Sequence, residues 1–247
     1  FNWPEISDVP EMLDQLADVE MHAIQTSGNC IRNTTTDQFA GVIADEIVDP
    51  RPYCEIIRQW STFHPEFAFL PRKFKIAVNA CPSADRAAIS VHDIGLEIVK
   101  NDQGEIGFKV LVGGGLGRTP MVGSEINEFL AEKDLLSYLE AILRVYNRHG
   151  RRDNKYKARI KILVKAMTPA VFKEKVAAEW EHIKDSAMQV TDEELARVKA
   201  FFTAPAYELL PNESDSFTQK LEESKGFANW VKRCTNEHKV DGYRIVT

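Results

Sequence analysis

The stretch of sequence that decides the fold is AAISVHDIGLEIVKNDQGEIGFKVLV, residues 87–112. Apolar residues recur along 87–99 and along 105–112, a pattern that predicts two β-strands. The four residues from Asn101 to Gly104 form a typical hairpin connection, so these strands should pair antiparallel. One more strand is expected at about 73–80.

Helical patterns surround these strands, and a further short strand is predicted at Met21 to Gln25. Clustered strands followed by clustered helices indicate an α+β fold, with helices packed on one side of an antiparallel sheet. The segment 203–216 is the best candidate for a linker. Helices are expected from Asp8, from Pro50 to before Pro65, from Leu135 to near Gly150, from near Asp153, from Thr168 and from Thr191.

The composition is that of a globular protein, with 44% hydrophobic residues, 28% charged residues and a net charge of −6. No apolar run is long enough to cross a bilayer, so we expect no membrane association and a cytoplasmic location. The chain starts without Met or a secretory signal, and 242–247 begin a strand-like alternation and then stop. We therefore expect an interior fragment of a longer protein.

The cysteines are few and widely separated, and none belongs to a C-x-x-C pair, which argues against a disulfide scaffold. We expect ordinary reduced thiols. The four are Cys30, Cys54, Cys81 and Cys234.

Two lysines are predicted to point to the same place. On a strand, side chains alternate between faces, so Lys73 and Lys75 should lie together on the face opposite the core. Beside Arg72, this pair suggests an anion site, and the alternative is an ordinary solvated strand face. The residues expected in the core are Phe74, Ile76 and Val78.

Two loops could also contact an anion. Arg32 lies in the polar loop 26–36, where it could bind an anion or simply cap nearby carbonyls. The glycine-rich segment 113–117 follows a strand and could form an anion-binding nest, or a bulged turn with glycines at positive φ. It does not fit the dinucleotide fingerprint, because Arg118 stands where a glycine is needed, and it lacks the Gly-Lys-Ser/Thr of a P-loop.

A cationic run occupies residues 151–161 in an otherwise acidic chain. It could be a solvated helix face or a polyanion patch. We do not expect nucleic acid as a ligand, because only Tyr156 could stack on a base. His92 and Asp93 are adjacent, lack a nucleophile or third partner, and are assigned a structural role.

Four of these segments, 26–33, 70–75, 112–116 and 150–161, resemble in the same order the nitrite/sulfite reductase haemoprotein family of the bacterial assimilatory type. The resemblance covers nearly the whole chain. It implies the family's sirohaem-domain fold, sirohaem bridged to a [4Fe–4S] cluster, and reduction of sulfite to sulfide or nitrite to ammonia. It also implies an electron donor that is a flavoprotein or a ferredoxin.

The resemblance assigns roles to the cations. Arg32, Lys73 and Lys75 match the catalytic residues that hold the oxyanion and assist its protonation. No residue of this chain is implied as a metal ligand, because the family's cluster-binding cysteine pairs are absent and would lie outside it. The residues implied to contact the macrocycle are Arg72, Asn33, Gly113, Gly114, Gly115, Arg118, Arg159 and Lys161.

The resemblance also suggests a division into the end of a ferredoxin-like unit at 1–26, a sirohaem and substrate domain at 27–185, and a helical linker at 186–247. The isolated chain is then expected to be inactive, since no cluster can form in it. The alternative function is a non-catalytic module that binds a tetrapyrrole or a polyanion such as nucleic acid.

Overall fold

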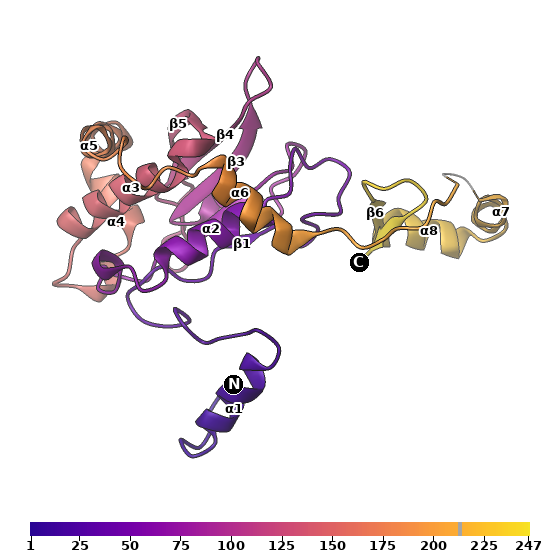
Figure 1. The fold of residues 1–247 in the computed structure, drawn as a ribbon, viewed down its shortest axis with the longest axis horizontal. Helices are drawn as coiled ribbons and strands as arrows, with labels where there is room; N and C mark the ends of the chain where they lie inside the picture. Colours follow the sequence, from indigo (N-terminus) through magenta and orange to yellow (C-terminus); the bar gives the residue numbers. More distant parts are fainter. Residues whose placement is uncertain (212–213) are drawn as a thin grey trace.

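The computed structural model describes residues 1–211 and 214–247 and shows an α+β fold, which confirms the expected class (Figure 1). The helices are α1 (Val9–Ala17), α2 (Arg51–Ser61), α3 (Leu135–His149), α4 (Ile160–Met167), α5 (Pro169–Glu181), α6 (Asp192–Lys199), α7 (Asp215–Glu223) and α8 (Lys225–Cys234). The strands are β1 (Thr35–Thr36), β2 (Ile76–Asn79), β3 (Ile94–Lys100), β4 (Ile106–Val112), β5 (Ser124–Ala131), β6 (Thr235–Glu237) and β7 (Arg244–Val246). Short 3₁₀ turns are η1 (Pro65–Phe67), η2 (Ile89–Val91), η3 (Glu132–Asp134), η4 (Lys155–Lys157) and η5 (Ala200–Phe202).

Strands β1 to β5 form one sheet in chain order, and its strand directions are mixed. β3 pairs antiparallel with β4, and β4 with β5, so the predicted hairpin at 101–104 is confirmed. β2 runs parallel to both β1 and β3, so an antiparallel sheet throughout is the wrong expectation for these strands. The hairpin argument applies only to strands joined by a short turn, whereas residues 80–93 cross over between β2 and β3.

The apolar patterns overestimate the length of two strands. β2 begins at Ile76 rather than at 73, and β3 begins at Ile94 rather than at 87. Ala88 has a left-handed backbone with φ of 53°, and η2 follows it, so the chain cannot be extended there. The short strand predicted at 21–25 is wrong, because this segment forms turns and no ladder.

The crossover explains why residues 87–91 look like part of a strand. Their apolar side chains pack against the face of the sheet that the helices leave free, so they are buried without pairing in the ladder. The cluster on that face contains Ala77, Ala87, Ile89 and Leu111. β5 is not predicted from the sequence, and its pairing with β4 contains register shifts that interrupt regular alternation.

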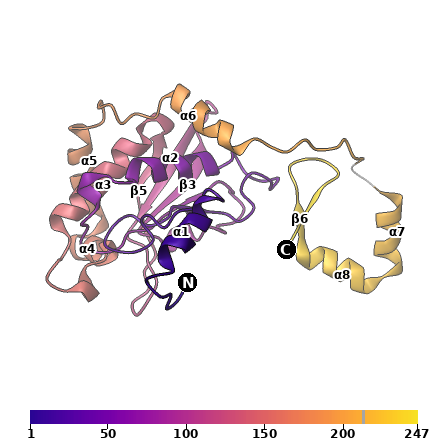
Figure 2. The same cartoon turned by 60° about the horizontal axis from the view of Figure 1, so that its bottom comes forward.

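Helices α2 to α6 contribute to one core on the other face of the sheet, as expected (Figure 2). The apolar stripe of α3 lies at the centre of this core, because residues three and four apart share one side of a helix. Its fully buried members include Leu135, Leu139, Ile142, Leu143 and Tyr146. Leu195 and Val198 of α6 belong to the same core. The domain boundary predicted between residues 185 and 186 would separate them from this core, and it stays a prediction.

Several helix boundaries follow the predicted signals. Gly150 ends α3, and the Thr191 hydroxyl caps α6, as predicted. Three other predicted helix starts differ in detail. Pro50 is the residue before α2 rather than its first residue, and Asp8 makes no cap hydrogen bond at α1. The helix expected from near Asp153 begins only at Ile160, with α4. Cap signals therefore locate these helix starts to within a turn or two, but not to the residue.

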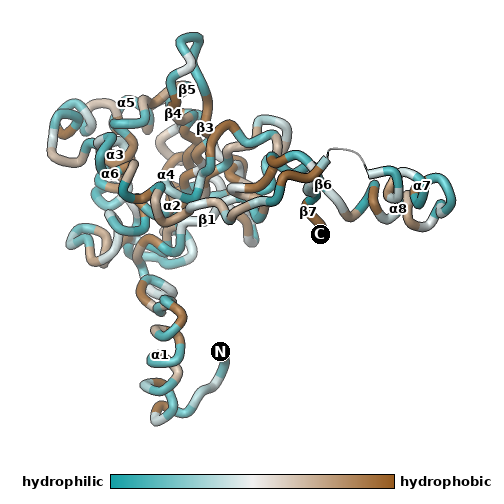
Figure 3. The backbone as a smooth tube through the Cα atoms, turned by 45° about the vertical axis from the view of Figure 1, so that its right-hand side comes forward, coloured by the Kyte–Doolittle hydropathy of each residue, from teal (hydrophilic) through white to brown (hydrophobic). Residues whose placement is uncertain are grey.

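Both terminal parts stand away from the body. α1 projects from it without a single buried residue, with hydrophilic and hydrophobic positions alternating along its length (Figure 3). The hairpin of β6 and β7 and helices α7 and α8 form a small lobe at the other end, where the predicted strand at the C-terminus is confirmed. This lobe touches the body through Lys239, which donates its N–H to Val42 and pairs with Glu46. Among the described residues, no helix has both the length and the apolar character needed to span a membrane.

Candidate anion-binding site

Backbone pairing brings two of the predicted segments together. The Leu70 N–H donates to Asn29 O at 2.8 Å, and the Phe74 N–H donates to Cys30 O at 3.0 Å. The Arg32 N–H in turn donates to Phe74 O at 2.7 Å. The polar loop therefore runs alongside the segment that leads into β2, which places Arg32 next to Lys75.

The predicted alternation on β2 and its approach is confirmed. Phe74, Ile76 and Val78 are fully buried, whereas Lys73 is half-buried and Lys75 is exposed. The two ammonium groups are therefore on the side away from the main core.

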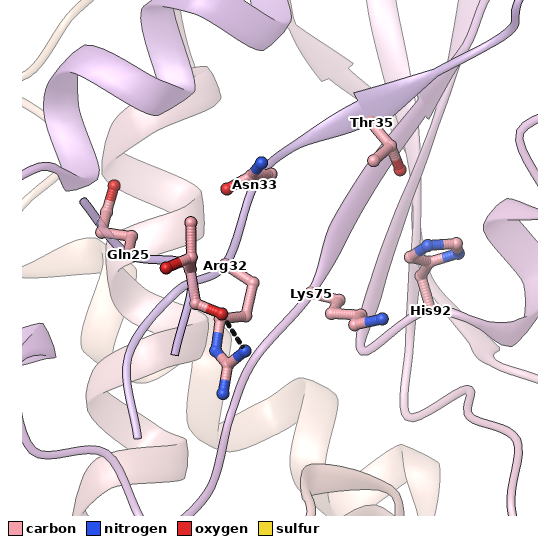
Figure 4. A pocket seen from close by; sticks show the side chains of 7 residues that line it. Gln25, Arg32, Asn33, Thr35, Lys75 and His92 are labelled. Atoms are coloured by element: carbon pink, nitrogen blue, oxygen red, sulfur yellow. Dashed lines mark hydrogen bonds between the residues drawn. The ribbon is translucent and has the colours of Figure 1, made fainter. Parts of the chain in front are cut away.

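A cavity of about 250 Å³ opens beside this segment (Figure 4). It contains three of the predicted site residues, Arg32, Asn33 and Lys75, while Lys73 is not among its lining residues. In Figure 4 the Lys75 side chain reaches toward His92, which comes from the crossover between β2 and β3. The lining residues are Gln25, Thr26, Arg32, Asn33, Thr35, Lys75 and His92.

Arg32 is held by its own loop. Its guanidinium donates to Thr26 O at 2.6 Å and to Gly28 O at 2.9 and 3.3 Å. This is the carbonyl-capping arrangement that the sequence left open as the alternative. Because a guanidinium has five N–H groups, three such hydrogen bonds leave two donors for a ligand in the cavity.

The charges around Lys73 show that the cations converge. Partial burial lowers the pKa of Lys73, and the positive charges of Lys75, Arg159, Arg32 and Arg72 lower it further, in that order. Five cations from three separate stretches therefore share one region, which an anion would stabilise.

Arg159 is committed to an internal partner. It donates to the Asp93 carboxylate through Nε at 3.0 Å and through Nη2 at 2.7 and 2.8 Å. Asp93 is fully buried and also accepts the Lys75 backbone N–H at 2.9 Å. Burial raises the pKa of Asp93, and the Arg159 charge opposes this rise. In this structure the pair fixes the backbone beneath Lys75, which is the structural role predicted for Asp93.

In the glycine loop, residues 113–117, close packing requires a glycine at position 114. A Cβ on Gly114 would lie 2.5 Å from Ser90 O and 2.6 Å from His92 O. The N–H groups of Gly113 and Gly115 already donate to backbone carbonyls, those of Asp93 and Met121. The amides of Gly113 and Gly115 are therefore not free for the predicted nest, and Gly113, at φ 87°, fits the alternative of a bulged turn.

Lys161 holds the glycine loop from the other side. Its side chain is nearly buried, and Nζ donates to Thr119 O at 2.6 Å and to Leu116 O at 3.0 Å. Arg118, at the tip of the same loop, is exposed. Arg159 and Lys161, two of the four basic residues implied as cofactor contacts, therefore each stabilise a loop that borders the site.

His92 is the lining residue that the sequence did not predict. Its structural assignment rested on its position beside Asp93 with no nucleophile nearby. Only the crossover places the His92 ring in the same cavity as Lys75, and local sequence patterns do not predict which separate segments line one cavity. Thr26 and Thr35 also line the cavity and belong to the predicted polar loop 26–36, whereas Gln25 has no sequence signal of its own.

Within residues 1–211 and 214–247, no three His, Cys, Asp or Glu side chains gather in a way that could hold a metal ion. The four cysteines are all free thiols. Burial raises the pKa of both Cys54 and Cys81 to about 12, so neither is activated as a thiolate.

Comparison with known proteins agrees with the sequence motifs. The model of the family described as "Nitrite and sulphite reductase 4Fe-4S domain" matches residues 27–184. Sulfite reductase (ferredoxin) 1 of Mycolicibacterium paratuberculosis is 31% identical over 179 residues, which cover 72% of this chain and 32% of that protein. The assimilatory ferredoxin-dependent nitrite reductase of Haloferax mediterranei is 33% identical over 168 residues, which cover 66% of this chain and 28% of that protein.

A solved structure shows the same relationship. The Mycobacterium tuberculosis NirA protein matches with a TM-score of 0.65 at 30% identity, covering 73% of this chain and 32% of that one. The chain thus spans about a third, or slightly less, of the length of the curated relatives that it matches.

Proposed function

Because the chain belongs to the nitrite and sulphite reductase family, as its motifs indicated, we propose that it forms the anion-binding side of the redox centre in an enzyme that reduces sulfite or nitrite. The observation that carries this proposal is the placement of Arg32 and Lys75 on one cavity, beside the segment that bears Arg72 and Lys73. Arg32, Lys73 and Lys75 are the residues proposed to bind the oxyanion.

The proposed chemistry follows from charge. Sulfite and nitrite gain electrons while they lose oxygen, so negative charge develops on the departing oxygen atoms. Cations placed in advance around the anion stabilise that charge without reorganising solvent. Arg32 can offer its two remaining N–H donors, and the lysines offer ammonium groups that bind the anion and supply protons.

Membership of the family implies sirohaem and a [4Fe–4S] cluster as cofactors, and these supply the electrons when bound. The cationic residues fit a ring bearing many carboxylates, since an anion would offset the positive charges that, after partial burial, lower the pKa of Lys73. Arg72, Asn33 and Arg118 are proposed to contact the ring directly. Arg159, Lys161 and Gly113 to Gly115 are proposed to act by shaping the loops that border it.

The cluster ligands are proposed to lie outside these 247 residues, because the four cysteines are widely separated in sequence and none belongs to a C-x-x-C pair. The electron donor is proposed to be a ferredoxin, since both relatives carry that word in their names, with a flavoprotein as the alternative. The choice between sulfite and nitrite is left to experiment.

The first prediction tests the role of the lysines in the longer protein proposed to contain this chain, purified with both cofactors. Lys73→Ala and Lys75→Ala should each lower turnover of sulfite and nitrite by about 10² or more, because each removes a preorganised charge from the transition state. The haem absorption spectrum should be unchanged. Steady-state kinetics and spectra of the same samples provide the measurement.

The matched control is Lys100→Ala, an exposed lysine at the far end of β3, which should retain normal turnover. Normal turnover in both Lys73→Ala and Lys75→Ala would rule out the proposed role. Salt-sensitive binding of RNA by a protein that takes up no sirohaem would instead favour a non-catalytic polyanion-binding module.

A further inference from the structure

The His92 side chain is the one imidazole on the wall of the described cavity. It is half-buried and lies at the end of the crossover, between η2 and β3. Figure 4 shows its ring on the side of the cavity toward which Lys75 points. A group in this position can touch an anion that Lys75 binds and can also exchange protons with solvent.

One ring nitrogen is already committed. His92 Nδ1 lies 2.8 Å from Ala88 O. A carbonyl oxygen can only accept a hydrogen bond, so Nδ1 must carry a hydrogen. Nε2 makes no hydrogen bond with any residue in the described part of the chain and is therefore the nitrogen that can gain and lose a proton.

The backbone that carries the His92 ring is held in place by its neighbours. The His92 N–H donates to Ile89 O at 3.2 Å, and Gly114 packs so closely that a Cβ there would meet both His92 O and His92 N. The next residue, Asp93, is clamped by Arg159. The backbone on both sides of His92 is therefore fixed, which is the preorganisation that proton transfer requires.

We propose that His92 is a proton donor to the anion bound in this cavity, an inference that rests on the proposed reductase function. In this role the imidazolium donates the Nε2 proton to an oxygen of sulfite or nitrite, and the Ala88 carbonyl stabilises the cation through Nδ1. Water then returns a proton to Nε2. The imidazole therefore acts repeatedly during one turnover.

The step balances in electrons and atoms. Removal of each oxygen from sulfite or nitrite consumes two electrons and two protons, breaks one S–O or N–O bond and releases one water. The electrons come from the reductant of the proposed reaction, an iron–sulfur protein or flavoprotein, through the cofactors. His92 supplies one proton, and a lysine ammonium or water supplies the other.

Neighbouring groups are less suited to repeated proton transfer. A lysine ammonium can supply a proton, as proposed above, but an imidazole is the side chain that most readily both releases and regains one near neutral pH. Asp93 cannot serve, because it is fully buried and its oxygens accept from Arg159 and from the Lys75 backbone.

The test uses His92→Asn in the cofactor-loaded protein. The asparagine amide can keep the hydrogen bond to Ala88 O but has no proton to transfer at the Nε2 position. We expect kcat to fall by about 10²-fold, with KM changing less than about threefold, because general acid catalysis contributes that much without being needed for binding. His182→Asn, an exposed histidine at the end of α5, is the control and should keep wild-type kcat.

A second measurement does not depend on activity. ¹⁵N NMR of the six histidine rings in the 247-residue chain, with sulfite as the probe, should show the His92 Nε2 signal moving on titration. The signal is identified by its loss in His92→Asn. In Lys75→Ala the movement should disappear, because the anion is no longer held beside the ring.

The outcomes separate this inference from the proposed function. Wild-type kcat in His92→Asn, together with loss of turnover in Lys75→Ala, would overturn the role of His92 and leave the reductase function intact. Wild-type turnover in both variants would overturn both. A His92 signal that stays still while other signals of the cavity respond to sulfite would also contradict the inference.

Discussion

At the scale of single residues, the site is destabilised by its own charges. Lys73 is half-buried among Lys75, Arg159, Arg32 and Arg72, and only Arg159 has a carboxylate partner among the salt bridges of the described residues. Like charges held together without an anion reduce the stability of the fold. Such a cluster is typical of a binding site, where groups needed for function lower the stability of the folded protein.

This leads to a prediction about stability without cofactors. Lys73→Gln should stabilise the chain by roughly 0.5 kcal/mol at low ionic strength, the size of a surface charge interaction. The gain should shrink as salt screens the repulsion. Thermal unfolding at low and high salt gives the measurement, with Lys100→Gln as the control that should show no gain.

The sign of the pH dependence follows from the lowered pKa of Lys73. Below that pKa the ammonium is charged and the full repulsion is present. As pH rises through it toward the ordinary value of 10.5, wild-type Lys73 becomes neutral and the difference from Lys73→Gln disappears. A variant that is less stable than wild type at low salt would contradict the electrostatic account.

At the scale of elements, loops border the site and internal bonds hold them. The crossover loop is tied to α4 by Arg159 and Asp93, and the glycine loop is tied to the same helix by Lys161. Gly114 lets the two loops touch. The basic residues at the start of α4 thus position both loops, in addition to any contact with a ligand.

Gly114→Ala should therefore be destabilising by about 1–3 kcal/mol, because a methyl group has no space between Ser90 O and His92 O. The control is Gly117→Ala in the same loop, where a Cβ meets nothing within 4 Å and only the positive φ of 103° is unfavourable, costing about 1 kcal/mol. Urea unfolding of both variants compares the two. Equal loss of stability would show that close packing at Gly114 is unimportant.

At the scale of the whole molecule, we propose that the chain supplies one side of a site. Its cations come from residues 32, 72–75 and 159, all within the segment that matches the family. α1 and the C-terminal lobe stand away from this body and contribute little to its core. The electron-delivering cluster is proposed to be held by residues beyond these.

The corresponding prediction concerns the 247-residue chain alone. It should bind sulfite, detected by NMR as above, but reduce neither sulfite nor nitrite when supplied with sirohaem and a chemical electron donor. The reason is that no cluster can be assembled from four separated cysteines. Measurable reduction by this chain, at a rate above that of free sirohaem, would contradict the prediction.

The sequence by itself determined the α+β class, the hairpin at 101–104, the approximate positions of helices α1 to α6 and the outward direction of Lys73 and Lys75. These features depend on local periodicity and turn chemistry, which neighbouring residues encode. The same local patterns, in order along the chain, were enough to indicate the family.

Only the tertiary structure decided the parallel pairing of β2, the ion pair of Arg159 with Asp93 and the place of His92 in the cavity. Each of these depends on contacts between residues far apart in sequence, and periodicity carries no information about them. The crossover at 80–93 is the clearest case, because it reverses the expected strand direction and also places the His92 imidazole in the same cavity as Lys75.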